Sequence, residues 1–254
     1  MTVHFVGAGP GAADLLTLRA ADLLANADVV LYPGTYLDEG FLVHVSPDAD
    51  LVDTQDLDLD QIMARLIDAD RDGLEIVRLV SGDPSVYSAL TEQTQRLDAA
   101  GVEWDVTPGV PAYAAAAALV GRELTVPLVA QSVVLTRAQA RSTAMPSGEA
   151  LASFAATGAT LVVHLAITRI RELMDELASH YGTDCPVVVV HRASQPGQLV
   201  LQGTVADIAE QVELAGLRQA AVILVGRALD PGTATPSYLY DPARDRAGKN
   251  QGRG

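Results

Sequence analysis

Short apolar runs alternate with longer amphipathic segments along most of this chain, and this alternation constrains the fold more than any other feature. In the first half, short runs typical of strands occupy residues 3–8, 28–33, 50–54, 75–80 and 102–106. The segments between them are expected to form helices over 16–27, near 36–44, over 59–73 and over 86–100. Strands joined by helices of this length form crossover connections. The pattern therefore predicts an α/β fold with a mainly parallel five-stranded sheet.

The second half repeats the alternation after an alanine-rich segment at 112–120 that is expected to be helical. Its predicted strands occupy residues 132–136, 160–165, 186–193, 198–205 and 220–228, and the clearest helix covers 167–181. Only Ser194 to Gly197 separates the third of these strands from the fourth, which favours an antiparallel hairpin and hence a mixed sheet. We therefore expect two α/β domains, at 1–111 and 121–230. A mostly disordered tail, rich in Gly, Pro and charge, is expected at 231–254.

Composition and charge disfavour several classes of protein. Hydrophobic residues make up 49% of the 254 residues, which suffices for a large core, and only 4% are aromatic, so this core should be aliphatic. The formal charge of −15 disfavours nucleic acid as a partner, because phosphates attract Lys and Arg. No apolar run approaches the ~20 residues of a membrane-spanning helix. With no secretion signal and Cys185 as the sole cysteine, we expect a soluble, cytoplasmic protein that makes no membrane contact.

The first glycine-rich motif, VGAGPG at 6–11, follows the first predicted strand. Glycines at this point permit a sharp turn and a close approach of a ligand to the main chain. The motif is compatible with a dinucleotide-binding loop, with another ligand loop or with a plain turn. Pro10 lacks the backbone donor that a pyrophosphate needs, and Pro33 ends the second strand where an acidic residue would bind a ribose. Both prolines argue against a nicotinamide-dependent oxidoreductase, which remains the alternative from another class.

Two further motifs follow the fourth and fifth predicted strands: VSGDP at 80–84 and TPGVPA at 107–112. Ligands of parallel sheets bind beyond the carboxyl ends of the strands, so these two loops and residues 7–11 are expected to lie at one edge. Asp83 either supplies a carboxylate to a site or caps the following helix. The alanines after the third loop either permit close packing on a ligand or partner, or simply reflect the high helix propensity of alanine.

In combination, the three loops resemble those of the tetrapyrrole methylases, and the resemblance extends from Thr2 to about Arg227. The segments that favour a member acting on a corrin precursor are 27–37, 80–90, 107–118, 122–127 and 133–146. The resemblance implies methyl transfer from S-adenosylmethionine, with S-adenosylhomocysteine as product, to a small tetrapyrrole in cobalamin biosynthesis. It also implies a homodimer and a cofactor cleft between the two domains. Enzymes that act on the cobalt-loaded substrate or on uroporphyrinogen share these features and remain alternatives.

The resemblance also implies which residues contact the cofactor. They are Gly9, Pro10, Ser81, Gly82, Asp83, Val86, Tyr87, Pro111, Ala112, Leu165 and Ala193. Two positions depart from related enzymes. Pro111 stands where relatives often carry Thr or Ser, so one side-chain hydrogen bond is missing. Pro33 stands where uroporphyrinogen methylases carry an acidic residue, so a proton-transfer role there does not transfer to this chain.

Arginines are the expected ligands for the carboxylate groups of the substrate, because a guanidinium pairs with a carboxylate in a bidentate way. Arg137 and Arg141 are the first candidates, followed by Arg122 and Arg192; surface ion pairs are the alternative role for all four. Tyr113 is a further candidate for positioning, unless it is a core residue. The five histidines show no metal-ligand spacing, so no metal site is expected. His191 acts either as a base or as a hydrogen-bonded structural residue.

Overall fold

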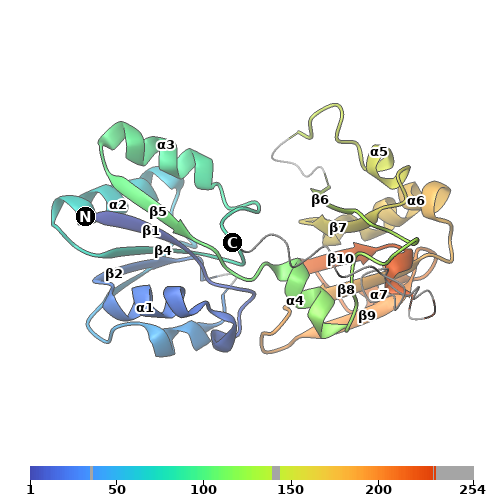
Figure 1. Ribbon diagram of the computed structural model, residues 1–254, viewed down its shortest axis with the longest axis horizontal. Helices are drawn as coiled ribbons and strands as arrows, with labels where there is room; N and C mark the ends of the chain where they lie inside the picture. Colours follow the sequence, from blue (N-terminus) through green and yellow to red (C-terminus); the bar gives the residue numbers. More distant parts are fainter. Residues whose placement is uncertain (35–36, 139–143, 231, 233–254) are drawn as a thin grey trace, which may run out of the picture. The chain divides into compact units, whose positions relative to one another are not determined.

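The computed structural model describes residues 1–34, 37–138, 144–230 and 232, and these form two compact units (Figure 1). The first unit contains Met1–Val120 together with the short segments Val190–Val200 and Gln219–Val222. The second contains Gly121–Val189, Leu201–Arg218 and the described residues from Ile223 onward. Almost all of the expected tail at 231–254 lies outside the described residues.

The first unit is built on a five-stranded sheet in the order β3-β2-β4-β1-β5, and each neighbouring pair is parallel. Its strands are β1 (Thr2–Gly7), β2 (Val29–Tyr32), β3 (Asp50–Asp53), β4 (Ile76–Val80) and β5 (Glu103–Thr107). Gly7 pairs with Val80, and Val6 pairs with Thr107. The carboxyl ends of the three neighbouring strands β4, β1 and β5 are therefore level with one another. The parallel sheet that the sequence predicts is confirmed.

Alternate residues of each strand point to opposite sides of this sheet. Apolar side chains therefore lie on both faces, and helices cover each of them. The helices of the unit are α1 (Leu18–Asn26), α2 (Leu59–Arg71), α3 (Leu90–Ala100) and α4 (Ala112–Leu119). Phe5 and Leu31 pack with Leu66 of α2 in one core, whereas Val30 and Leu79 pack with α1 in the other. Each of these large side chains contributes about 1.5–3 kcal/mol on burial.

Two predicted helices differ from those observed. The segment near 36–44 forms a 3₁₀ helix, Glu39–His44, in which the Asp38 side chain accepts from the N–H of Gly40. The helix expected from residue 86 begins only at Leu90, because Tyr87 and Ala89 have positive φ angles of 54° and 56° that an α-helix cannot contain. The other helix boundaries agree with prediction within a few residues.

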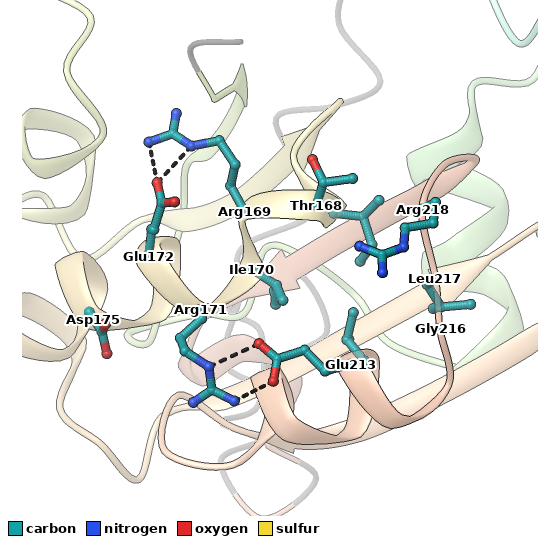
Figure 2. A pocket seen from close by; sticks show the side chains of 12 residues that line it. Thr168, Arg169, Ile170, Arg171, Glu172, Asp175, Glu213, Gly216, Leu217 and Arg218 are labelled. Atoms are coloured by element: carbon teal, nitrogen blue, oxygen red, sulfur yellow. Dashed lines mark hydrogen bonds and ion pairs between the residues drawn. The ribbon is translucent and has the colours of Figure 1, made fainter. Parts of the chain in front are cut away.

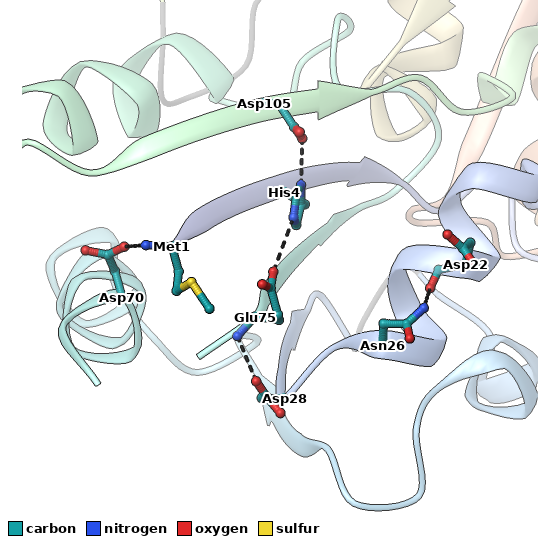
Figure 3. A network of polar contacts seen from close by, with 8 residues as sticks. All are labelled: Met1, His4, Asp22, Asn26, Asp28, Asp70, Glu75 and Asp105. Carbon is teal, nitrogen blue, oxygen red and sulfur yellow. Dashed lines mark hydrogen bonds and ion pairs between the residues drawn. The ribbon is translucent and has the colours of Figure 1, made fainter. Parts of the chain in front are cut away.

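Polar contacts join the amino-terminal region of β1 to its surroundings (Figure 3). The ring of His4 lies 2.9 Å from Asp105 and 3.7 Å from Glu75, and the N–H of Glu75 donates to Asp28 at 2.8 Å. The terminal ammonium group pairs with Asp70 at 3.0 Å. Such partly exposed pairs contribute at most about 1 kcal/mol each, and they lie at the end of the sheet opposite the three loops.

The second sheet is mixed, as predicted, with the order β6-β7-β10-β8-β9. Its strands are β6 (Val133–Arg137), β7 (Thr160–His164), β8 (Pro186–His191), β9 (Leu199–Thr204) and β10 (Ala221–Val225). β6 runs parallel to β7, whereas β10 runs antiparallel to it. The N–H of Val205 donates to Cys185, which joins the end of β9 to the start of β8 as an antiparallel hairpin requires. The helices are α5 (Leu151–Ala155), α6 (Ile170–Tyr181) and α7 (Ile208–Leu214).

Candidate functional site

The first and second glycine loops are joined directly by backbone hydrogen bonds at the carboxyl edge of the first sheet. The N–H of Gly9 donates to the carbonyl of Gly82 at 3.1 Å, and the N–H of Gly82 donates back to Gly9 at 2.8 Å. Both residues have positive φ angles of about 70°, which glycine adopts without strain. The prediction that these loops meet at one edge is confirmed.

The third loop enters the same cluster through close backbone packing of three glycines. A Cβ added to Gly7 would lie 2.4 Å from the nitrogen of Gly109, and one added to Gly109 would lie 2.2 Å from the carbonyl oxygen of Gly82. Both distances are far shorter than van der Waals contact, and the colliding atoms are backbone atoms that have little freedom to move. No side chain fits at Gly7 or Gly109 without displacing a neighbouring loop.

Asp83 ties the second loop to the third. Its carboxylate accepts from the N–H of Gly109 at 2.9 Å, from the N–H of Ser85 at 2.8 Å and from the Ser85 hydroxyl. Partial burial alone would raise the pKa of Asp83, but these three donors outweigh it and lower that pKa below its ordinary value. The alternative that Asp83 caps the next helix is wrong, since the N-cap of α3 is Ala89. The carboxylate shapes the loops.

The candidates Val86 and Tyr87 follow this loop in a tight, non-helical segment. The N–H of Val86 donates to the carbonyl of Asp83 at 3.2 Å, and Val86 is half-buried. The side chain of Tyr87 is 48% exposed. Tyr87 is therefore not a core residue, and its ring is accessible beside the second loop.

A segment from the second half of the chain fastens the first loop, and sequence reasoning missed it. The amide of Gln195 donates to the carbonyl of Pro10 at 2.6 Å, and the Ser194 hydroxyl accepts from the N–H of Ala12 at 3.1 Å. A Cβ on Gly11 would lie 2.1 Å from the Gln195 side chain. The candidate Ala193, which is buried, directly precedes this clamp. The sequence predicts only a turn here, because such distant contacts leave no local pattern.

Helix α4 begins at the third loop with N–H groups that have no acceptor among the described residues. Its N-cap residue is Pro111, which forms no side-chain cap, and the first intrahelical bonds to Pro111 come from Ala114 and Ala115. The N–H groups of Ala112 and Tyr113 lie before these bonds, so they keep their capacity to donate to another acceptor. Both residues are half-buried. The donors at this loop are therefore backbone N–H groups, as expected because Pro111 stands where relatives often carry Thr or Ser.

The remaining candidates are spread over both units. Leu165 directly follows β7 in the second unit and is 63% exposed with a φ of 52°. Arg137 ends β6 and donates to the carbonyl of Ala144 at 3.5 Å. Arg122 donates to the carbonyl of Leu229 at 3.0 Å, so part of its guanidinium serves the fold. Arg192, in the first unit, is exposed. Arg141 lies outside the described residues.

A cavity of about 400 Å³ on the second unit contains none of the predicted site residues (Figure 2). Two of its three arginines bind carboxylates: Arg169 bonds Glu172 at 2.6 Å, and Arg171 forms a two-pronged pair with Glu213 at 2.9 and 2.5 Å. A second cavity of about 350 Å³ includes Arg137 in its lining. Arg137 is thus a substrate-binding candidate that borders a cavity of this unit.

The histidines and the cysteine do not form a reactive centre in the described part of the chain. The Nδ1 of His191 lies 3.0 Å from the carbonyl oxygen of Gln219, which favours the structural role over that of a base. Cys185 is buried, and burial raises its pKa to about 11. Within the described ranges, His, Cys, Asp and Glu form no group of three that would suit a metal ion. No described helix is long and apolar enough to span a membrane.

The fold has two sheets with flanking helices, and Gly/Pro loops are joined at the carboxyl edge of the parallel sheet. This arrangement is typical of a class of enzymes that bind small molecules at strand ends. The chain belongs to the tetrapyrrole (corrin/porphyrin) methylases, whose family model matches residues 2–209. Tetrapyrrole methylases use S-adenosylmethionine as their methyl donor.

Named relatives and solved structures agree with this family. The chain is 52% identical over 246 residues to the precorrin-4 C(11)-methyltransferase of Rhodococcus erythropolis, covering 97% of this chain and 99% of the relative. A cobalt precorrin-4 methyltransferase structure matches with a TM-score of 0.87 and 36% identity, covering 91% of this chain and 96% of that one. A uroporphyrin-III C-methyltransferase of Thermus thermophilus, complexed with S-adenosylhomocysteine, matches with a TM-score of 0.76 and 29% identity, covering 90% and 99%.

Proposed function

We propose that this protein transfers a methyl group from S-adenosylmethionine to ring carbon C-11 of precorrin-4, in cobalamin biosynthesis. The observation that carries the proposal is the interlocked cluster of Gly9, Gly82, Asp83 and Gly109, which builds a rigid backbone surface at a strand edge. The identity of 52% to a relative named precorrin-4 C(11)-methyltransferase supports the choice of substrate.

We propose that the cofactor is held mainly by residues of the first unit. They are Gly9, Pro10, Ser81, Gly82, Asp83, Val86, Tyr87, Pro111, Ala112 and Ala193. The residues present fit such a ligand, because the uncapped N–H groups of α4 offer donors to a carboxylate or a ribose hydroxyl. The half-buried Val86 offers an apolar contact. Leu165, in the second unit, is proposed on the family resemblance alone.

S-adenosylmethionine supplies an already activated methyl group on a positively charged sulfur, so the chain needs no nucleophile of its own. The protein's contribution is to hold two reactants in line, which is worth up to about 7–11 kcal/mol, and to keep water from the reactive macrocycle. We propose that Arg137 and Arg141 bind the acidic side chains of the substrate, with Arg192 in support. Arg122 contributes less, since it already bonds Leu229. Tyr113 remains a candidate for positioning.

The cobalt-loaded substrate is the nearest alternative. Relatives named cobalt-precorrin-4 C(11)-methyltransferase, from Priestia megaterium and Methanocaldococcus jannaschii, are each 36% identical to this chain, against 52% for the Rhodococcus erythropolis relative. This difference favours the metal-free substrate. The oxidoreductase alternative is weaker still. After Pro33, the N–H of Gly34 donates to Asp53 at 3.0 Å, so the carboxylate at the end of the neighbouring strand β3 already accepts from the backbone.

The class of cofactor is tested by calorimetry on the purified protein. We expect S-adenosylhomocysteine to bind and NADH to give no heat; the reverse would overturn the assignment. The substrate is tested by incubating the protein with methyl-labelled cofactor and, separately, precorrin-4 and its cobalt complex. Location of the new methyl at C-11 of the metal-free product by NMR is the expected result. Methylation of only the cobalt complex, or at another carbon, would replace the proposed substrate or position.

We further propose a cytoplasmic homodimer, on the resemblance to the family. The sequence adds only one argument, since a reducing compartment suits a chain with a single buried cysteine. Light scattering coupled to gel filtration measures the state directly. A mass of about one chain at micromolar concentration would contradict the dimer.

A further inference from the structure

Arg78 is a buried cation without an acidic partner in the described part of the chain. It lies on β4 between Phe5 of β1 and Leu31 of β2, on the face of the sheet whose core includes Leu66 of α2, and is only 9% exposed. Among the described residues, no carboxylate forms an ion pair with it. Burial disfavours its charged form and lowers its pKa to about 10. Keeping a charge in such surroundings is costly, so its neighbours show what it does there.

The guanidinium is held by neutral oxygens. Its Nε donates to Oε1 of Gln93 at 3.3 Å, and its Nη1 donates to the Thr54 hydroxyl and to the carbonyl of Leu79, both at 3.3 Å. Gln93 lies on the first turn of α3 and is 3% exposed. Its Nε2 donates in turn to the carbonyls of Ser88 at 3.3 Å and Ala89 at 3.2 Å.

In this series of hydrogen bonds, the donors and acceptors can be assigned in only one way. A guanidinium has donors and no acceptor, and a backbone carbonyl has acceptors and no donor. The Gln93 side chain therefore connects them in one orientation, with its oxygen toward Arg78 and its NH₂ toward the carbonyls. Arg78 thus fixes the amide, and the amide fixes two peptide groups.

The two peptide groups belong to an unusual stretch of backbone. Tyr87 and Ala89 are both left-handed, a conformation that is uncommon for residues with a side chain and persists only when the surroundings impose it. Ser88 lies between them, donating its hydroxyl proton to the carbonyl of Pro84 and accepting from the N–H of Leu90 at 3.3 Å. This stretch, 84–89, joins the Asp83 loop to α3 and carries Val86 and Tyr87.

We propose that Arg78 and Gln93 are positioning residues for the cofactor site: through the carbonyls of Ser88 and Ala89 they hold residues 84–89 in the shape that presents Val86 and Tyr87. The inference rests on the proposed function, because it assumes that these two residues meet the cofactor. Neither Arg78 nor Gln93 needs to touch the ligand itself. Their effect is on backbone shape.

If Arg78 and Gln93 served stability alone, substitutions that keep the protein stable would leave cofactor affinity unchanged. Such substitutions therefore separate a structural role from a positioning role. In Gln93→Glu the carboxylate pairs with Arg78 but cannot donate to the two carbonyls, which removes the hold on the segment while keeping the core polar group paired. In Arg78→Met an apolar chain replaces the buried charge, which removes the cost of keeping a cation in these surroundings, while the Gln93 amide loses its orientation. Gln95→Glu adds the same charge on an exposed position of the same helix and serves as the matched control.

The experiment measures S-adenosylhomocysteine affinity by calorimetry, melting temperature, and KM for each substrate. We expect both variants to melt close to the wild type and to bind S-adenosylhomocysteine about tenfold more weakly, as loss of one or two hydrogen bonds allows. KM for S-adenosylmethionine should rise and KM for the tetrapyrrole should not, while Gln95→Glu should match the wild type. If either folded variant binds with wild-type affinity, the inference fails. If the wild type itself does not bind S-adenosylhomocysteine, the proposed function fails and takes the inference with it.

Discussion

The carboxylate of Asp83 accepts a hydrogen bond from the backbone N–H of Gly109 at 2.9 Å, across 26 positions of sequence. This bond joins the loop after β4 to the loop after β5, on either side of the loop that follows β1. An acidic residue in a ligand loop suggests a direct contact with the ligand. Here its oxygens already accept three bonds from the protein, so its first task is to hold two loops together.

Substitution of Asp83 should therefore affect stability as well as binding. Asp83→Ala leaves the N–H groups of Gly109 and Ser85 without their acceptor, which costs about 1–3 kcal/mol, and S-adenosylhomocysteine binding should weaken with it. Asp83→Asn keeps one acceptor oxygen and should lose less of both. Urea unfolding and calorimetry on the three proteins provide the measurements. Full stability in Asp83→Ala, combined with weaker binding, would point to a direct ligand contact.

Gly7→Ala should destabilise the protein more than an ordinary surface substitution. The new Cβ would lie 2.4 Å from the nitrogen of Gly109, and relief of such overpacking costs about 1–3 kcal/mol or more. Gly148→Ala is the control, because a Cβ there meets nothing within 4 Å. Midpoints of urea unfolding compare the two. Equal midpoints for both variants would mean that the glycine cluster is less tightly packed than described.

Gln195→Ala should loosen the first loop without unfolding the unit. It removes the bond to the carbonyl of Pro10, a net loss of about 0.5–1.5 kcal/mol, and affinity for S-adenosylhomocysteine should fall by a few-fold. Gln202→Ala, on an exposed position of β9, should leave that affinity unchanged. Hydrogen exchange of Ala12, whose N–H donates to Ser194, should also accelerate in Gln195→Ala. Identical exchange in both variants would show that the clamp does not restrain the loop.

The free energy of unfolding should fall at alkaline pH because of Tyr181. Burial, followed by the neighbouring Cys185, raises its pKa to about 12, and its hydroxyl donates to the carbonyl of Ala159. In the unfolded chain the pKa is about 10, so the folded state favours the neutral form. This contribution is complete below about pH 10 and is lost as the pH rises through about 12. Denaturant unfolding across this range should show a steeper decline for the wild type than for Tyr181→Phe. Parallel curves would contradict this.

Arg137→Ala should weaken tetrapyrrole binding and leave cofactor affinity intact. A charged hydrogen bond to a carboxylate is worth about 1.5–3 kcal/mol, so KM for the tetrapyrrole should rise about 10- to 100-fold. Arg218→Ala removes an exposed arginine from the other cavity and should change neither constant. If KM for S-adenosylmethionine rises instead, Arg137 acts on the cofactor side. If neither changes, Arg137 serves the fold and not the substrate.

Much of the fold can be predicted from the sequence, because the fold depends on the local periodicity of apolar residues and on the positions of the glycines. The strands ending at Gly7 and Val80 have apolar runs, and the edge where their loops meet the loop after Thr107 follows from the parallel crossovers. The exact start of α3 does not follow. Its sequence is compatible with a helix from residue 86, whereas positive φ angles at Tyr87 and Ala89 delay the start to Leu90 in the structure.

The site was predictable in its loops and not in the contacts that fix them. The motifs around Gly9, Gly82 and Gly109 are visible as residue patterns, whereas the clamp by Ser194 and Gln195 joins positions more than 180 residues apart. The bond from Gly109 to Asp83 could not be predicted for the same reason, since Gly109 lies on another strand's loop. Long-range hydrogen bonds leave no periodicity in the chain that forms them.

The close packing of Gly7 and Gly109 limits how an enzyme of this type can diversify. Neither residue can acquire a side chain unless neighbouring backbone moves away, and the φ of 70° at Gly82 disfavours any residue with a side chain, so single mutations at these three positions cannot easily reshape the loop cluster. Changes in what the protein accepts must therefore come from accessible positions beside the glycine cluster, such as Tyr87. A library that varies those positions and leaves the glycines untouched is where altered selectivity should be found.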